Sequence, residues 1–479
     1  MSGWGAIYNN TSFSLRMQSE TLARLQEQTA TGARVIRASD DPTDARRILS
    51  LRDQTASVAS YLKNIDSVDL TLSEIDTQMQ KISSAMTQVQ GYLTQAATGT
   101  LSGAQRQGIA EAINQTLETV LGLANFKSMG RYLFGGADAA NQPYSAERTN
   151  GKITSVTYQG SLGDLQVPVA PGVNMPAAMV GDRIFRTDQR QSPVFLGNSG
   201  AVAGTGTSSA RGDAWLSVSH GTTTFGGGIG LAAGDSSDDG DTILGNSHTL
   251  TVDADNQTLR LDGGSAVAFE SGETNVRLTT AAGEVVYMDV SGLTLAGGTQ
   301  TVSISSTAKF SIDDGATSVE SDLTDGNLAV TDSRNGGILY VDTRQVARFG
   351  TDPVRIPGTN DLFSTLISVR DLMANDRDLS TSDQLRLLNE AVKSMDEVTG
   401  TLTQNLVIVG GRLQATESLR NSMEDIQAAS KDETSKLQDA DLVELAMQIA
   451  RSQNMYEMTL ASAAKLLNLS LLDFLGVTA

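Results

Sequence analysis

A sustained heptad pattern constrains the fold of this chain more than any other feature. Between residues 65 and 96, apolar side chains recur every seven positions in two interleaved series. The series are Ile65, Leu72, Met79, Met86 and Leu93, and Val68, Ile75, Ile82, Val89 and Ala96. This spacing is typical of the a and d positions of a coiled coil. A helix over 42–98 would be roughly 80 Å long, so it needs an equally long partner.

The C-terminal half of the chain offers that partner, because apolar heptad positions recur from Leu385 to Leu413. Gly410 and Gly411 lie within this pattern and should weaken or bend the helix, or allow a close approach. A break at 99–104 ends the first rod helix, and a second amphipathic helix follows it. We therefore predict a long antiparallel helical rod built from both chain ends. Its core is predicted to contain Ile65, Leu72, Ile75, Met79, Ile82, Met86, Val89, Leu406 and Leu413.

Amphipathic helices are also predicted at the two termini, over about 13–31 and 439–475. The C-terminal helix carries apolar residues on a face too wide for one partner helix to cover. We therefore expect neighbouring subunits to complete its packing. The interface residues predicted on this helix are Leu442, Ile449, Tyr456, Leu460, Leu467 and Leu471.

The stretch RASDDPTDARR, residues 37–47, separates the N-terminal helix from the rod helix. Asp41 is suited to cap the rod helix, and Pro42 suits its first helical position. Asp44 lies where the acidic residue of a capping box would be. The pattern predicts that one helix stops here and another starts.

The middle of the chain has a different composition, rich in Gly, Thr, Asp and Val. Asn150-Gly151 favours a hairpin turn, and short β-branched runs alternate with turn residues up to about 350. We predict an α+β protein with a β-rich middle domain, either a sandwich or a small barrel, inserted into the rod. The predicted divisions are terminal helices over 1–41 and 438–479, a rod domain with β-hairpins over 42–189 and 351–437, and an insert over 190–350.

Composition argues against several functions. The formal net charge of −20 disfavours nucleic acid or an anionic membrane as the main partner. The chain has no cysteine and two histidines, which cannot form a two-histidine zinc peptidase motif, so we predict no cofactor, no metal and no enzymatic activity. Arg211-Gly212-Asp213 matches an adhesion tripeptide, but an ordinary loop is the better interpretation. The first residues lack the charged and apolar regions of a cleaved signal peptide.

Five motifs, in order along the chain, resemble those of one family. They are LARLQEQTATGARVIRASDDPTDARRI (22–48), GRYLFGGADAANQPY (130–144), GDRIF (181–185), DLFSTLISVRDLM (361–373) and AKLLNLSLLDFL (464–475). They resemble the hook-filament junction proteins of the bacterial flagellum, of the hook-associated protein 3 type, which are relatives of flagellin. The resemblance covers about 1–190 and 355–479, and it does not extend to the insert.

The resemblance implies a structural subunit that forms an adaptor ring at the hook-filament junction. Its implied partners are further copies of itself, the preceding hook-associated junction protein, flagellin and a flagellar export chaperone. It implies secretion through the flagellar type III channel and location in the flagellum. The terminal helices would form an inner tube, and the link to the rod would lie between subunits. The link residues predicted at that interface are Arg34, Arg37, Asp40 and Asp41.

Two other functions remain open from the sequence. The chain could be a flagellin-type filament subunit, although the motifs at 39–45 and 133–144 look like those of the junction family. It could instead be a surface adhesion or binding protein that recognises a ligand through its β-rich insert.

Overall fold

The computed structural model describes residues 3–294 and 296–476, with side chains for 9–245, 248–294 and 296–465. The chain forms two compact units. The first comprises 1–72, 166–177 and 411–479, and the second comprises 73–165 and 178–410. Within the described residues, no helix combines the length and the apolar character needed to cross a membrane.

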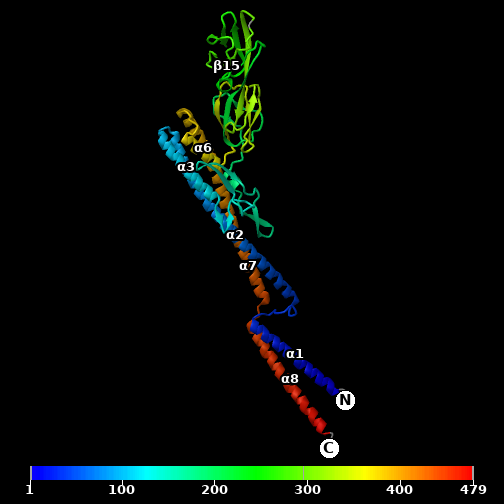
Figure 1. Cartoon of the computed structure of the whole chain (residues 1–479). Helices are drawn as coiled ribbons and strands as arrows, with labels where there is room; N and C mark the ends of the chain where they lie inside the picture. The colour runs from blue at the N-terminus through cyan, green and yellow to red at the C-terminus, as the bar shows by residue number, and fades with distance from the viewer. Residues whose placement is uncertain (1–2, 295, 477–479) are drawn as a thin grey trace. The chain divides into compact units, whose positions relative to one another are not determined.

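Long helices occupy both ends of the chain, blue to cyan toward the N-terminus and yellow to red toward the C-terminus in Figure 1, and two short helices lie between them. They are α1 (Gly3–Thr31), α2 (Pro42–Ala97), α3 (Gly103–Ala124), α4 (Gly181–Phe185), α5 (Ser237–Gly240), α6 (Leu362–Ala374), α7 (Thr381–Gln438) and α8 (Leu442–Gly476). The rod helix α2 follows its predicted bounds closely. α1 begins earlier than the predicted residue 13, and α7 continues through Gly410 and Gly411 without a break.

Polar contacts within each unit show that α2 and α7 run antiparallel. In the first unit, Arg420 of α7 donates to Asp66 of α2 at 3.0 Å, and Thr416 donates to Asp69 at 3.2 Å. In the second unit, Gln90 of α2 donates to Asp396 of α7. The predicted core residues of α2 are fully buried, whereas Leu406 and Leu413 of α7 are only half-buried. The burial therefore follows the α2 heptads more closely than those of α7.

Strands fill the middle of the chain. Those before α4 are β1 (Lys127–Ser128), β2 (Arg131–Tyr132), β3 (Tyr144–Thr149), β4 (Lys152–Tyr158), β5 (Leu165–Ala170) and β6 (Val173–Ala178), which pair as three successive two-stranded sheets. Those after α4 are β7 (Val194–Phe195), β8 (Val202–Ala203), β9 (Gly212–Phe225), β10 (Ala232–Ala233), β11 (Gly245–Asp253), β12 (Thr258–Leu261), β13 (Val267–Ala268), β14 (Val276–Thr279), β15 (Val285–Asp289), β16 (Thr299–Ser311), β17 (Val319–Ser321), β18 (Leu328–Thr331), β19 (Ile338–Asp342) and β20 (Gly350–Ile356). Long helices with a β-rich middle region confirm the predicted fold class.

The insert contains two separate hydrophobic cores. Its largest sheet has the order β13-β12-β11-β16-β9-β20-β7, with β17 also paired to β16. One core gathers Leu216, Phe310, Leu339 and Ile356, and the other gathers Leu250, Leu278, Val286 and Ile304. β9 and β16 are long enough to contribute residues to both. The insert therefore consists of two modules, and β9 and β16 run through both of them.

The predicted end of the insert at residue 350 needs correction. β20 starts at Gly350 and pairs with β9 from Gly350 to Ile356, and with β7 at Val354 and Arg355. The sheet therefore continues six residues into the segment assigned to the rod. The sheet extends past the predicted boundary because β20 pairs with both β9 and β7.

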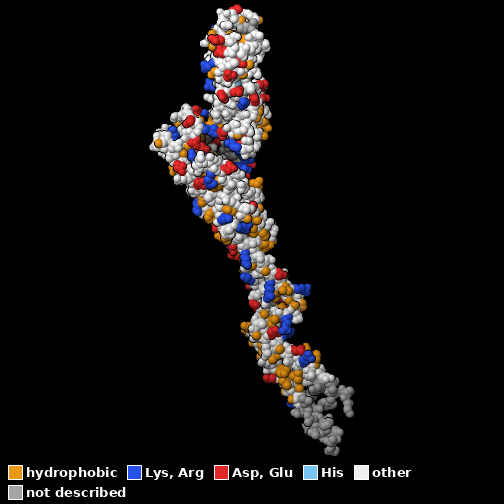
Figure 2. All heavy atoms as spheres, in the orientation of Figure 1, with side chains coloured by type: hydrophobic (Ala, Val, Ile, Leu, Met, Phe, Trp, Pro, Cys, Tyr) orange, Lys and Arg blue, Asp and Glu red, His pale blue; other side chains and the backbone are white. Residues whose placement is uncertain are grey.

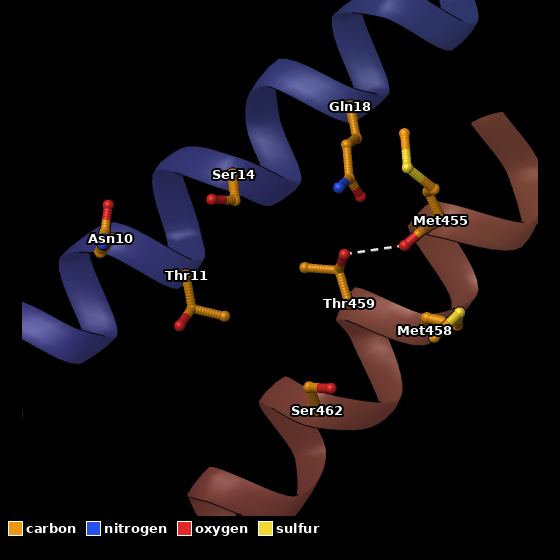
Figure 3. Close-up of a pocket in the computed structure, with 8 residues that line it drawn as sticks. All are labelled: Asn10, Thr11, Ser14, Gln18, Met455, Met458, Thr459 and Ser462. Carbon is orange, nitrogen blue, oxygen red and sulfur yellow. Dashed lines mark hydrogen bonds between the residues drawn. The ribbon is translucent and has the colours of Figure 1, made fainter.

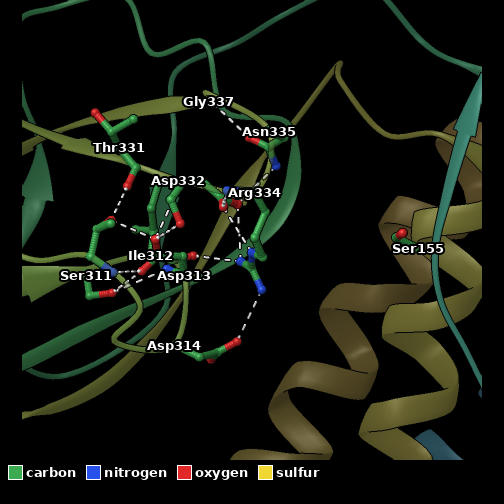
Figure 4. Close-up of polar contacts among 12 residues, drawn as sticks. Ser155, Ser311, Ile312, Asp313, Asp314, Thr331, Asp332, Arg334, Asn335 and Gly337 are labelled. Atoms are coloured by element: carbon green, nitrogen blue, oxygen red, sulfur yellow. Dashed lines mark hydrogen bonds and ion pairs between the residues drawn. The ribbon is translucent and has the colours of Figure 1, made fainter. Parts of the chain in front are cut away.

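A polar network closes the turn that follows β16 (Figure 4). The carboxylate of Asp313 accepts hydrogen bonds from Ser311, Thr317 and Ser333. Burial raises the pKa of Asp313, but hydrogen bonds from Ser333, Thr317 and Ser311 outweigh it and hold the pKa well below its usual range. Arg334 contacts Asp332 and Asp314 beside it. The carboxylates of Asp313, Asp314 and Asp332 therefore stabilise the turns of the insert.

Candidate assembly interface

The link between α1 and α2 pairs with the link between α7 and α8. Gly32 ends α1 with a positive φ of 70°, which a glycine adopts without strain. The amide of Arg34 then donates to the carbonyl of Gln438 at 2.6 Å, and the amide of Ala440 donates to Gly32 at 2.9 Å. Ala33 and Asp439 form an isolated β-bridge between the two links. The two links that join the terminal helices to the rod helices therefore lie side by side and are hydrogen-bonded to each other.

Arg34 and Arg37 stabilise these two links. The guanidinium of Arg34 donates to the carboxylate of Asp44 and to the carbonyl of Leu437, the latter at 3.0 Å. Its hydrogen bond to Asp44 raises the pKa of Arg34 above its usual value. Arg37 donates to Glu27 of α1 at 2.9 Å. Both side chains stay partly exposed, so intrachain contacts leave room for further ones.

The acidic residues of the link hold its backbone. Asp41 accepts from the amides of Thr43 and Asp44 at 3.0 and 3.1 Å, which caps α2. The amide of Arg37 donates to Asp40 at 2.8 Å, and this backbone hydrogen bond lowers the pKa of Asp40. The capping box expected at Asp44 does not form, because its carboxylate binds Arg34 instead. The predicted intersubunit role of these residues stays a prediction.

The terminal helices α1 and α8 pack side by side and leave much apolar surface open (Figures 1 and 2). Of the predicted interface residues, Leu442 and Leu460 are 57% and 45% exposed, and Ile449 and Tyr456 are half-buried. Leu467 and Leu471 lie outside the residues whose side chains are described. Other exposed apolar side chains of the pair are Phe13, Met17, Val443, Met447, Met455 and Met458.

A groove of about 490 Å³ lies between α1 and α8, and Figure 3 shows its lining. Asn10, Ser14 and Gln18 face it from α1, and Met455 and Met458 face it from α8. The α1 wall is polar, and the α8 wall combines the two methionines with Thr459 and Ser462. Two helices that meet in this way leave apolar area uncovered, which favours packing with further helices.

A second site lies where the insert joins the rod. An aromatic cluster there draws its rings from three of the five motifs: Phe134 and Tyr144 from 130–144, Phe185 from 181–185 and Phe363 from 361–373. Their ring centroids lie 4.9 to 6.3 Å apart, at the distances of favourable aromatic pairs. Sequence reasoning found the motifs but missed this convergence, which the shared aromatic residues at their ends could have signalled.

The remaining candidate sites have structural roles. Arg211 of the adhesion-like tripeptide lies 3.5 Å from Asp188, and the amide of Gly212 donates to Thr359 at 2.8 Å. The tripeptide is therefore fixed at the start of β9 and does not form a free loop. Across the described part of the chain, no three His, Asp or Glu side chains are grouped to hold a metal ion.

Comparison with known proteins gives a consistent result. Residues 5–139 match the bacterial flagellin N-terminal helical region. The chain is 29% identical over 160 residues to flagellar hook-associated protein 3 of Escherichia coli K12, covering 33% of this chain and 48% of that protein. It is 26% identical over 165 residues to flagellar hook-associated protein 3 of Salmonella typhimurium LT2, covering 34% and 50%. The chain thus spans about half the length of these relatives.

Two solved structures are also similar. FlgL of Xanthomonas campestris has a TM-score of 0.42 and 16% identity, covering 80% of this chain and 98% of that chain. Flagellar hook associated protein-3 of Legionella pneumophila has a TM-score of 0.44 and 15% identity, covering 81% and 98%.

The sequence matches indicate the class first: the N-terminal part of this chain is similar to the helical region of bacterial flagellin. Within that class, its sequence relatives are flagellar hook-associated protein 3 from two bacteria. The resemblance drawn from the five motifs is confirmed.

Proposed function

We propose that this chain is a structural subunit of the bacterial flagellum that forms the adaptor ring at the hook-filament junction. The filament assembles on that ring. The observation that carries the proposal is the flagellin-type helical region, joined to a terminal helix pair whose apolar side chains are left exposed. Such a pair gains burial energy only when other helices cover it, as in an assembled tube.

The three parts of the chain then have distinct tasks. The terminal helices, 1–41 and 438–479, would pack with those of neighbouring copies in the inner tube. The rod, 42–189 and 351–437, would form the layer outside it, and the insert would face outward. The partners in this arrangement are further copies of the chain, the preceding hook-associated protein and flagellin. An export chaperone would hold the chain before secretion through the flagellar channel.

A deletion strain tests the function. Loss of a junction subunit should leave free hooks on the cell and flagellin shed into the medium, which electron microscopy and immunoblotting would detect. Loss of a filament subunit should leave the junction in place with no filament and no flagellin in the medium. Intact filaments with altered adhesion would instead support a binding role for the insert and contradict our proposal.

A pair of leucine variants tests the terminal helices directly. Leu442 and Leu460 are exposed in α8, whereas Leu445 is 7% exposed and lies in the described core. Each leucine fully buried on assembly contributes about 1.5–3 kcal/mol. The double variant Leu442→Ser, Leu460→Ser should therefore keep the melting temperature of the secreted monomer but release flagellin from cells. Leu445→Ser is the control, and it should lower the stability of the monomer itself.

A further inference from the structure

The tip of the β1–β2 hairpin exposes a bulky apolar side chain in an unfavourable backbone conformation. Met129 and Gly130 form the two-residue turn, with φ of 46° and 81°. Turns with two positive φ values favour Asn-Gly, because bulky side chains are strained there. The β3–β4 hairpin of the same chain follows that preference, with Asn150 and Gly151 at φ of 52° and 79°. Met129 therefore occupies a position that its own turn disfavours.

Packing within the chain gives no compensation for this strain, since Met129 is 72% exposed. The base of the hairpin is nevertheless held firmly. The amide of Leu133 donates to Phe126 at 3.3 Å, that of Tyr132 donates to Ala139 at 2.8 Å, and Leu133 itself is buried. The hairpin thus presents Met129 from a fixed base. Strained residues held in this way are found most often where they serve a function.

The same tip is positively charged. Lys127 and Arg131 flank Met129 and are exposed, and neither makes an ion pair within the described residues. Lys127 instead lies 4.4 Å from the centre of the Tyr132 ring, which orders it beside the tip. The chain as a whole carries a formal net charge of −20. A basic tip on a chain of strongly negative net charge is attracted to another copy of the same chain.

We propose that the segment Phe126–Arg131 is a docking finger that binds an acidic surface of a second copy of this chain, with Met129 inserted into an apolar recess. The inference rests on the proposed function, because copies in a ring repeat one contact between two different surfaces. The finger is one of those surfaces. Met129 supplies the apolar anchor, and Lys127 and Arg131 orient it.

The variant Met129→Asn separates docking from folding. It restores the residue that the turn favours and removes an exposed apolar side chain, so the secreted monomer should melt at the same or a higher temperature. Cells carrying it should nevertheless shed several-fold more flagellin. Leu162→Asn is the matched control, because Leu162 is 61% exposed elsewhere in the same unit and should have no effect on filament retention. Unchanged filament retention with Met129→Asn would overturn the inference.

Cross-linking identifies the occupant. The chain has no cysteine, so Met129→Cys introduces a single thiol for a photoactivatable maleimide. In isolated hook-filament complexes, the expected product is a covalent dimer of this chain, identified by mass spectrometry, that is absent with Leu162→Cys. A cross-link to another flagellar protein, or no cross-link, contradicts docking on a second copy. That failure is distinct from failure of the junction role, which the deletion strain reports independently.

Discussion

The rings of Tyr144 and Phe363 lie 4.9 Å apart, although one precedes the insert and the other follows it. Tyr144 ends one family motif, and Phe363 lies near the start of another at the beginning of α6. Their contact brings together the chain segments that flank the β-rich middle. The two ends of the insert are thus held next to the aromatic cluster.

The Tyr144 hydroxyl allows a direct test of that packing. It is buried and has no hydrogen-bond partner, whereas the hydroxyl of Tyr158 donates to the carbonyls of Phe134 and Ser161. A buried unpaired hydroxyl costs about 1–3 kcal/mol. Tyr144→Phe should therefore unfold at equal or higher urea concentration than the natural chain. Tyr158→Phe is the control and should lose about 1 kcal/mol, so an opposite ranking would refute this account.

Glu397 of α7 holds both connections to the insert. One carboxylate oxygen accepts from Thr187 at 2.7 Å, and the other accepts from Asn360 at 2.9 Å. The buried Arg355 lies 3.8 Å from the second oxygen and 3.5 Å from Glu390. Glu397→Ala should cost about 1–3 kcal/mol in urea unfolding, because it leaves the buried amide of Asn360 without its acceptor, whereas Arg355 keeps Glu390 at 3.5 Å. Glu424→Ala, at an exposed position of the same helix, should change stability by less than about 0.5 kcal/mol.

His248 should make the module of the insert built around Leu250 and Ile304 sensitive to pH. Its two ring nitrogens lie 2.5 Å from Asp262 and 2.6 Å from the carbonyl of Leu244, so both contacts are satisfied when both nitrogens carry protons. Burial lowers the pKa of His248, but the hydrogen bonds to Asp262 and Leu244 outweigh burial and raise it.

A raised pKa in the folded state means that His248 stabilises the fold fully below about pH 6.5. This stabilisation is lost as the pH rises through the folded pKa. Hydrogen exchange of the β11 and β12 amides should therefore be slower, after correction for intrinsic rates, at pH 5.5 than at pH 8. His248→Gln should abolish the difference; a difference that persists in this variant would assign it to another group.

The pKa of His220 is shifted in the opposite direction to that of His248. Burial lowers the pKa of His220. Its Nε2 donates to the hydroxyl of Thr223, which itself donates to Asp241, and its Nδ1 is buried without a partner. Its neutral form is favoured in the folded state, so its contribution is present above pH 6.5 and is lost as the pH falls below that value.

The two cores of the insert predict that the module around Leu250 and Ile304 can be removed alone. Phe225 of β9 faces Ile304 of β16 in the antiparallel register, so Asn-Gly can replace 226–303 as a two-residue turn. The remaining module should fold and be secreted, with its melting transition retained. Replacement of the whole stretch 190–350 should instead destabilise the protein, because it leaves β20 without β9 and β7. Equal loss of secretion in both variants would contradict the division into two modules.

The sequence by itself determined the local order of this protein. The heptads of α2, the cap at Asp41 and the turn at Asn150-Gly151 depend on spacing and on residue conformations that act within a few positions. These signals predicted the rod, its start and one hairpin. The family motifs indicated the related proteins for the same reason, since each is a short continuous stretch.

Tertiary structure decided which distant groups meet. Asp44 was expected to close a capping box, but Arg34 lies close enough to bind its carboxylate. The half-burial of Leu406 and the continuation of β20 to Ile356 depend on partners far away in sequence. The contact between Tyr144 and Phe363 does as well. No local pattern specifies such contacts, because loop closure and competition among possible partners settle them only when the whole chain packs.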